Sequence, residues 1–158
     1  MKKFLLFITL SISLLAQSLF SELIYNSRSF FVAGIAHQNI DNYSNAQALH
    51  LSYNYMSMYK WGFDIGYSQS FYKAENEKTK EERNFSSAYI FATYMVPLNK
   101  YMGFKSKAGY AKNESAKDGL GYGVDVIFQM NQSSGFSLGF QKMNKHINYF
   151  IVNTVYKF

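Results

Sequence analysis

Four charged residues interrupt otherwise uncharged stretches of the chain and are the first candidates for chemistry. They are two carboxylates and two ammonium groups: Asp64, Lys105, Lys107 and Asp125. Charges inside a protein must be paired or hydrated to be tolerated, and two groups of each sign can form a neutral cluster. We therefore expect a polar ion network in the interior of the fold. A conduction pathway through that interior is the alternative.

His50 and Ser52 are two residues apart, so a strand would place both side chains on the same face. A histidine and a serine within reach of each other could act as base and nucleophile. The sequence identifies no acidic partner that would orient His50, and we interpret the pair as polar lining of the interior. His37 and His146 lie in predicted loops, too far apart in sequence for their spacing to indicate a metal site.

The glycines alternate within apolar segments and do not precede a helix, so no phosphate-binding loop is predicted. The chain has no cysteine, which excludes disulfides and thiolate metal sites. The sequence therefore predicts no catalytic residue, no metal and no cofactor.

The elements that position these residues are strands, because large apolar residues alternate with small or polar ones along most of the chain. The clearest example has Phe63, Ile65 and Tyr67 on one face, and Asp64, Gly66 and Ser68 on the other. About eight such segments have the length of membrane strands: 29–36, 49–55, 61–71, 85–96, 102–110, 120–129, 136–141 and 149–158. Long connections (37–45, 73–84, 111–118) alternate with short ones (56–59, 97–100, 131–134), and the last connection, 143–146, is short although its place in the alternation predicts a long one.

The composition indicates which solvent the two faces meet. Aromatic residues make up 19% of the 158 residues and charged residues 16%, against about 25% charged in an average soluble domain. The second face carries mainly Gly, Ser, Ala and Asn, which suit the inside of a narrow barrel, and the four mid-strand charges fall on that face. The apolar stripes carry no charge, and a Lys or Arg at the bilayer midplane would cost roughly 2 to 4 kcal/mol. The sequence predicts an all-β fold: a closed antiparallel up-and-down transmembrane β-barrel of about eight strands.

Segment 85–96 is ambiguous because both of its faces are apolar. Tyr89, Phe91 and Met95 alternate with Ile90, Ala92 and Tyr94, and we predict that the first set faces lipid. Aromatic residues near strand ends are typical of the girdles at the two membrane interfaces. We predict a periplasmic girdle of Tyr59, Trp61, Tyr101, Tyr156 and Phe158, and an outer girdle of Tyr72, Phe85, Tyr110 and Tyr122.

The first residues have the pattern of a secretory signal peptide. Lys2 and Lys3 precede an apolar run, 4–15, and the small residues Ala16 and Ser18 follow it. We predict a signal peptide over 1–18, with Ser21 as an alternative cleavage site, and a barrel domain over 19–158. Nucleic-acid binding is not predicted, because the Lys and Arg residues are scattered and mixed with Glu.

The last segment has a stripe of period two that ends on an aromatic residue: Phe150, Val152, Thr154, Tyr156 and Phe158. Together with 49–55, 61–72 and the Gly-Leu-Gly-Tyr-Gly start of 119–128, it resembles the small outer-membrane barrels of the OmpX, OmpA-barrel and opacity-protein group. The resemblance covers nearly the whole mature chain. It implies an outer-membrane location in a Gram-negative bacterium, periplasmic termini, and a carboxy-terminal stripe recognised by the barrel assembly machinery.

The resemblance is specific for architecture and weak for activity. It favours a non-enzymatic surface or structural barrel that contributes to adhesion or envelope integrity. A small porin-like pore is the alternative, and a lipid A modifying barrel enzyme a third hypothesis. Connection 73–84 holds interleaved charges that could meet lipopolysaccharide or a host ligand, although a solvated loop tip is the simpler interpretation: Lys73, Glu75, Glu77, Lys78, Lys80, Glu81, Glu82 and Arg83.

Overall fold

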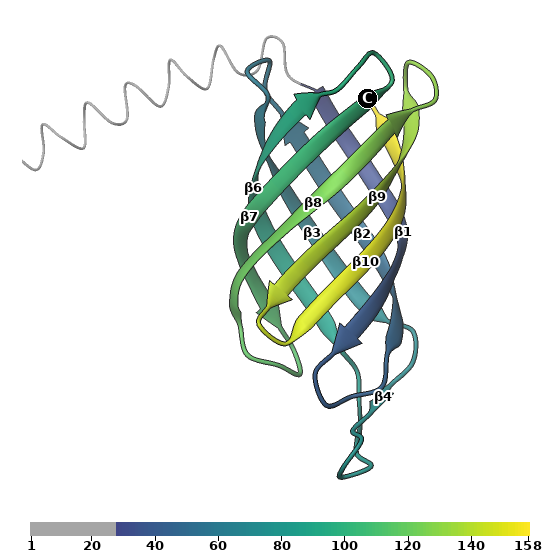
Figure 1. Ribbon diagram of the computed structural model, residues 1–158, viewed down its shortest axis with the longest axis vertical. Helices are drawn as coiled ribbons and strands as arrows, with labels where there is room; N and C mark the ends of the chain where they lie inside the picture. The colour runs from purple at the N-terminus through teal and green to yellow at the C-terminus, as the bar shows by residue number, and fades with distance from the viewer. Residues whose placement is uncertain (1–27) are drawn as a thin grey trace, which may run out of the picture.

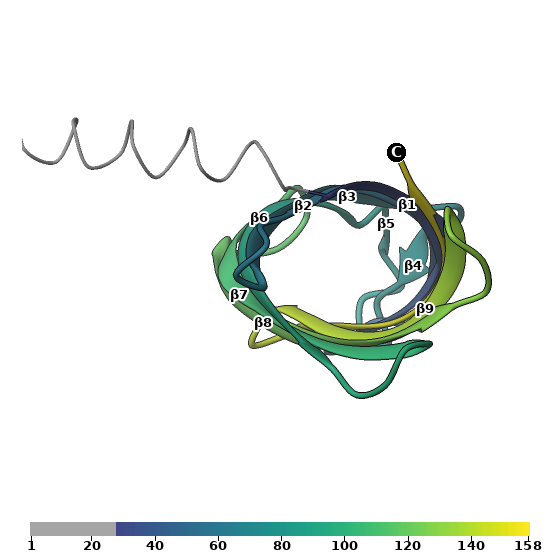
Figure 2. The same ribbon diagram turned by 90° about the horizontal axis from the view of Figure 1, so that it is seen from above.

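A computed structural model describes residues 28–158 and shows a closed ring of eight antiparallel strands (Figures 1 and 2). The strands are β1 (Arg28–Ile40), β2 (Ala46–Met56), β3 (Trp61–Ser70), β6 (Ser86–Pro97), β7 (Met102–Asn113), β8 (Gly119–Gln129), β9 (Ser134–Asn144) and β10 (Ile147–Lys157). Each barrel strand pairs with the next one along the chain, and β1 pairs with β10 to close the ring. The predicted fold class is confirmed.

The predicted signal peptide and its cleavage site lie outside the described residues. Within 28–158, no helix has the length and apolar character needed to cross a membrane.

The two ends of the barrel differ, and we name them by what they carry. The terminal end holds Arg28, Phe158 and the three short turns 57–60, 98–101 and 130–133. The loop end, at the bottom of Figure 1, holds the remaining four connections. One of these contains an unpredicted hairpin of two short strands, β4 (Ala74–Glu75) and β5 (Glu82–Arg83), which projects beyond the ring.

Alternation along each strand turns apolar side chains outward. In β3, Phe63, Ile65 and Tyr67 are exposed on the outer face, whereas Asp64 and Ser68 are buried inside. The other strands follow the same rule, with Leu49, Val124, Leu138 and Val152 among the exposed residues. A closed barrel pairs every strand edge, so no row of backbone groups is left open.

The predicted orientation of segment 85–96 is wrong. Tyr89 and Phe91 are buried inside the barrel, Met95 lines its interior cavity, and Ile90 is exposed on the outer face. Glycines make room for the two rings: Gly66 is paired with Tyr89 and Gly109 with Phe91. A Cβ at Gly66 would overlap the Tyr89 ring, and one at Gly109 would crowd the Phe91 ring. The rings fill space that the opposing strands leave empty.

The half of the lumen near the loop end is filled mainly by apolar side chains, with a few buried polar ones such as Gln38 and Ser87 among them. This loop-end plug consists of buried residues from several strands and from the connection before β6: Ile40, Phe85, Phe91, Met143, Ile147, Tyr149 and Ile151. The prediction that Phe85 belongs to the outer girdle is therefore wrong. Phe85 is only 2% exposed and packs edge-on against Tyr43, because the connection before β6 is bonded to Ser70 at the end of β3 and turns its ring toward the lumen.

The other predicted girdle residues lie on the surface. Tyr59, Trp61, Tyr101, Tyr156 and Phe158 are exposed at the terminal end, and Tyr72, Tyr110 and Tyr122 are exposed toward the loop end. Tyr and Trp at these levels present an apolar ring to lipid and a polar group to the interface.

Candidate functional site in the barrel lumen

The four mid-strand charges meet inside the barrel. The Lys105 Nζ lies 2.9 Å from the Asp125 Oδ2 and 3.3 Å from the Asp64 Oδ2. The Lys107 Nζ lies 3.0 Å from the Asp125 Oδ1 and 3.8 Å from the Asp64 Oδ2. All four side chains are almost completely buried, and their formal charges sum to zero. We call these four residues the ion cluster.

Neutral polar side chains complete the ion cluster. The Asn54 Oδ1 accepts a hydrogen bond from the Lys105 Nζ at 2.5 Å, and the Asn54 Nδ2 donates to the Asp64 Oδ1 at 3.2 Å. The Lys105 ammonium therefore has three acceptors for its three donors. A buried charge network is stable only when its members are satisfied in this way.

A chain of hydrogen bonds links the ion cluster to the opposite wall of the lumen. The Tyr89 hydroxyl lies 3.4 Å from the Asp64 Oδ1 and 2.8 Å from the His50 Nε2. The His50 Nδ1 lies 2.9 Å from the Asn153 Oδ1, which can only accept, so Nδ1 donates. The Asn153 Nδ2 then donates to the Ser137 hydroxyl at 3.2 Å. This chain ties strands on opposite sides of the ring together.

His50 and Ser52 both face the lumen, but they do not form a base and nucleophile. Both ring nitrogens of His50 are engaged by Tyr89 and Asn153, while the Ser52 hydroxyl accepts a hydrogen bond from the Asn54 Nδ2 at 3.0 Å. The geometry fits structural polar lining better than an activated nucleophile. Among residues 28–158, no cluster of side chains has the composition of a metal site.

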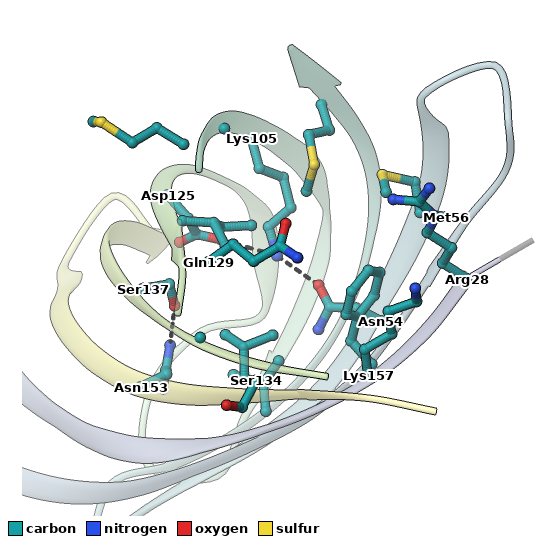
Figure 3. A pocket seen from close by; sticks show the side chains of 18 of the residues that line it. Arg28, Asn54, Met56, Lys105, Asp125, Gln129, Ser134, Ser137, Asn153 and Lys157 are labelled. Atoms are coloured by element: carbon teal, nitrogen blue, oxygen red, sulfur yellow. Dashed lines mark hydrogen bonds and ion pairs between the residues drawn. The ribbon is translucent and has the colours of Figure 1, made fainter. Parts of the chain in front are cut away.

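A cavity of about 270 Å³ occupies the half of the lumen near the terminal end (Figure 3). We call it the vestibule. It opens between the terminal-end turns and reaches down to the ion cluster, so that Asp64, Lys105, Lys107 and Asp125 form its floor. The loop-end plug lies on the far side of this floor. The lumen is therefore a pocket that opens at one end, and it is not an open channel through the barrel.

The charges of the hairpin are paired mainly with one another. Lys80 lies 2.9 Å from Glu75, Arg83 lies 3.0 Å from Glu81, and Lys73 lies 3.9 Å from Glu82. No salt bridge within 28–158 involves Glu77 or Lys78, which lie near the tip. All of these pairs are well exposed, so each contributes little to stability.

The carboxy-terminal stripe lies on the outer face of β10. Phe150, Val152, Tyr156 and Phe158 are exposed, and the Thr154 hydroxyl donates to the Ala33 carbonyl at 3.0 Å. These residues are therefore presented to the surroundings of the barrel.

Several residues of the lumen network could not be assigned from sequence. The sequence predicts the wrong face for Tyr89, and Asn54 and Asn153 are neutral residues that no pattern distinguishes from other polar residues. The signal for Tyr89 is indirect: Gly66, at a lumen position of β3, leaves space that a large side chain on the neighbouring strand must fill.

Comparisons with known proteins find likeness in structure alone. No protein-family model matches the chain, and no curated protein matches it. The crystal structure of Ail, the attachment invasion locus protein of Yersinia pestis, in complex with the heparin analogue sucrose octasulfate is 18% identical, with a TM-score of 0.61 over 84% of this chain and 99% of that chain. OprG from Pseudomonas aeruginosa is 10% identical, with a TM-score of 0.61 over 83% of this chain and 96% of that chain.

A de novo designed transmembrane β-barrel is also similar, at 11% identity and a TM-score of 0.63 over 83% of this chain and 95% of that chain. Because a barrel designed without any natural ancestor matches as well as natural ones, the likeness describes architecture and not activity. The chain has the fold of the small eight-stranded outer-membrane β-barrels.

Proposed function

We propose that the chain is an integral protein of the outer membrane of a Gram-negative bacterium, with the terminal end in the periplasm and the loop end outside the cell. The observation that carries this proposal is the apolar outer face of a closed ring. Large residues such as Ile65, Leu138 and Val152 are exposed there, while the mid-strand charges turn inward. Such a surface is unfavourable in water and suited to hydrocarbon.

We further propose that the protein is a non-enzymatic surface barrel that contributes to adhesion or envelope integrity. The support is the hairpin, which extends the fold beyond the loop end (Figure 1). It is anchored to the first connection, because the Ser44 amide donates to the Glu75 carbonyl at 2.9 Å and the Glu77 amide to the Asn42 carbonyl at 3.1 Å. An anchored and charged projection is suited to contact with lipopolysaccharide or with a ligand on a host cell.

The partners follow from this location. Lipopolysaccharide surrounds the loop end of any barrel in the outer membrane, and the structurally similar Ail was crystallised with a sulfated ligand. The exposed carboxy-terminal stripe is the segment that we propose is read by the barrel assembly machinery. No observation favours a pore, since the plug fills one half of the lumen. No observation favours a lipid A enzyme either, since His50 and Ser52 are hydrogen-bonded to other residues and not to each other.

Location is tested by a heat-modifiable gel shift on isolated outer membranes. A closed barrel migrates faster before boiling than after, and we expect this shift only in the outer-membrane fraction. Absence of the protein from that fraction would contradict the proposal.

The surface role is tested by replacing residues 73–84 with a Gly/Ser loop and measuring bacterial attachment to host cells and envelope resistance to detergent. The matched control is Lys60→Asn, which changes a charge in a terminal-end turn. We expect the loop replacement to reduce attachment or detergent resistance and the control to leave both unchanged. If both variants behaved like the unmodified protein, the hairpin would have no such role.

A further inference from the structure

The terminal end of the barrel carries basic side chains and no acidic one among the described residues. Arg28, Lys60, Lys100 and Lys157 lie there. Every Asp and Glu of residues 28–158 lies instead in the ion cluster or toward the loop end. Glu22 lies outside the described residues. The loop end differs, because its positive and negative groups are mixed and form salt bridges.

Three of the four basic residues line the vestibule: Arg28, Lys100 and Lys157. Alternation places Arg28 on the same face of β1 as the buried Val32, and Lys157 on the same face of β10 as the buried Val155. Lys157 is paired with Phe30, so Arg28 and Lys157 lie near each other on neighbouring strands. Figure 3 shows both side chains at the same cavity. Lys60 does not line it.

These three cations are not neutralised within the described part of the chain. No salt bridge there involves Arg28, Lys100 or Lys157, and the terminal carboxylate of Phe158 pairs with none of them. Lys100 lies over the Tyr101 ring at 4.8 Å, a contact that leaves its charge uncompensated.

The floor of the vestibule does not compensate this charge either. The ion cluster is neutral as a whole, and its carboxylates are engaged by Lys105 and Lys107. The mouth therefore carries an excess of three positive side chains above a neutral floor. The three residues are exposed at the opening of the vestibule. Like charges around one opening repel one another, and a bound anion would relieve this repulsion.

We propose that the vestibule is a binding site for a phosphate group presented from the periplasmic side. A phosphate monoester carries about 1.5 to 2 negative charges at pH 7 and three strong acceptor oxygens, which matches several converging cations better than a single carboxylate does. The guanidinium of Arg28 supplies paired donors for phosphate oxygens, and Lys100, Lys157 and the Ser134 hydroxyl lie around the same space. A volume of about 270 Å³ suits a small molecule or a single headgroup.

The test uses the full mature chain folded in a neutral detergent, with its backbone amide signals followed by NMR. Glycerol 3-phosphate is added as a soluble phosphate monoester, and glycerol as its uncharged counterpart. In a second arm, the protein is placed in phosphatidylcholine nanodiscs with or without phosphatidic acid, which carries the same chemistry on a lipid. Saturable shifts of Asn54, Gln129 and Ser134 with either phosphate probe support the proposal, and the responding arm identifies the source.

Variants decide whether the basic residues of the vestibule are responsible for phosphate binding. Arg28→Gln combined with Lys157→Gln is expected to weaken phosphate affinity by about tenfold or more. Lys100→Gln changes only a turn residue, and it provides a second variant with little risk to folding. Lys60→Asn is the matched control, expected to change affinity by less than about twofold. Lys60 has a positive φ of 70°, and asparagine tolerates this conformation.

The heat-modifiable gel shift verifies that each variant is folded. No saturable shift with either phosphate probe, or an equal loss of affinity in Lys60→Asn, would overturn the proposal. The mouth would then be a hydrated basic rim without a specific ligand.

Discussion

Lys105 and Asp125 occupy paired positions on β7 and β8, and their charged groups lie 2.9 Å apart inside the barrel. Direct cross-strand pairing aims both side chains at the same point of the lumen, so the contact needs no adjustment of the backbone. Lys107, two residues further along β7, and Asp64, on β3, complete the cluster. The ion cluster is therefore a consequence of strand register.

Removing one carboxylate of the ion cluster should destabilise the barrel strongly. Asp125→Asn leaves Lys107 with only the Asp64 carboxylate, 3.8 Å away. Breaking a buried pair typically costs about 3 to 5 kcal/mol. We expect a loss of this size in the free energy of unfolding, measured by urea titration in lipid vesicles through Trp61 fluorescence. The control is Glu77→Gln in the exposed hairpin, and a loss in Asp125→Asn as small as in this control would contradict the prediction.

Adding a methyl group at Gly66 should disturb the lumen network. A Cβ there would overlap the Tyr89 ring, so Gly66→Ala must move the hydroxyl that lies 2.8 Å from the His50 Nε2. Overpacking of this kind costs about 1 to 3 kcal/mol. Gly103→Ala is the control, because its nearest atoms are 3.5 Å or more from the new carbon. Equal stability of the two variants would show that Tyr89 can move without cost.

A charge on the outer face should cost free energy according to its depth in the membrane. Ile65→Arg places a guanidinium in the middle of β3, at an expected cost of about 2 to 4 kcal/mol, whereas Leu120→Arg near the loop end should cost about 0 to 1 kcal/mol. Equilibrium folding into vesicles measures both values. If the two variants were equally stable, the outer face would not be in contact with hydrocarbon.

The unmodified protein should conduct no ions in planar bilayers. The loop-end plug is dense, with Phe91, Met143, Ile147 and Tyr149 fully buried. Removing two rings with Phe91→Ala and Tyr149→Ala should create space between the vestibule and the loop end, and raise the frequency of current steps. Regular channel openings in the unmodified protein would contradict the assignment of the plug.

Phe158 should matter more for assembly in the cell than for stability. Its ring is 73% exposed and lies 6.3 Å, centroid to centroid, from that of Tyr53, so Phe158→Ala loses little packing. We expect a several-fold lower yield of heat-modifiable protein in the outer membrane, but a free energy of unfolding within about 1 kcal/mol of the unmodified value. The exposed turn residue Met130, replaced by Ala, is the control. A normal yield of Phe158→Ala would remove the proposed assembly signal.

The sequence was informative where the two faces of a strand differ in character. In β3 and β8, apolar residues alternate with Gly, Ser and Asp, so the inside and the outside could be distinguished, and with them the location of Asp64 and Asp125. In β6 both faces are apolar, and the prediction that Tyr89 and Phe91 face lipid is wrong. Only the identity of residues on neighbouring strands, such as Gly66 and Gly109, explains their burial, and strand pairing must be known before those neighbours can be identified.

The ion cluster, the vestibule and the hairpin also differ in how far each could be predicted from sequence. Charges that must be neutralised, such as Lys105 and Lys107, could be assigned to an interior network from sequence alone. The vestibule could not be anticipated, because Arg28 and Lys157 are ordinary basic residues until closure of the ring brings β1 beside β10. The hairpin also escaped detection, since its strands have only two residues each.

The loop-end plug depends on contacts between residues that are distant in the chain. The Gln38 amide donates to the Tyr149 hydroxyl across 111 positions, and Ser87 reaches the same hydroxyl across 62. The first contact can form only when the first and last strands have met, and the second only when β6 and β10 both line the closed lumen. Water is therefore fully excluded from this half of the lumen only once the ring closes, and contacts between residues so distant in the chain predict slow folding.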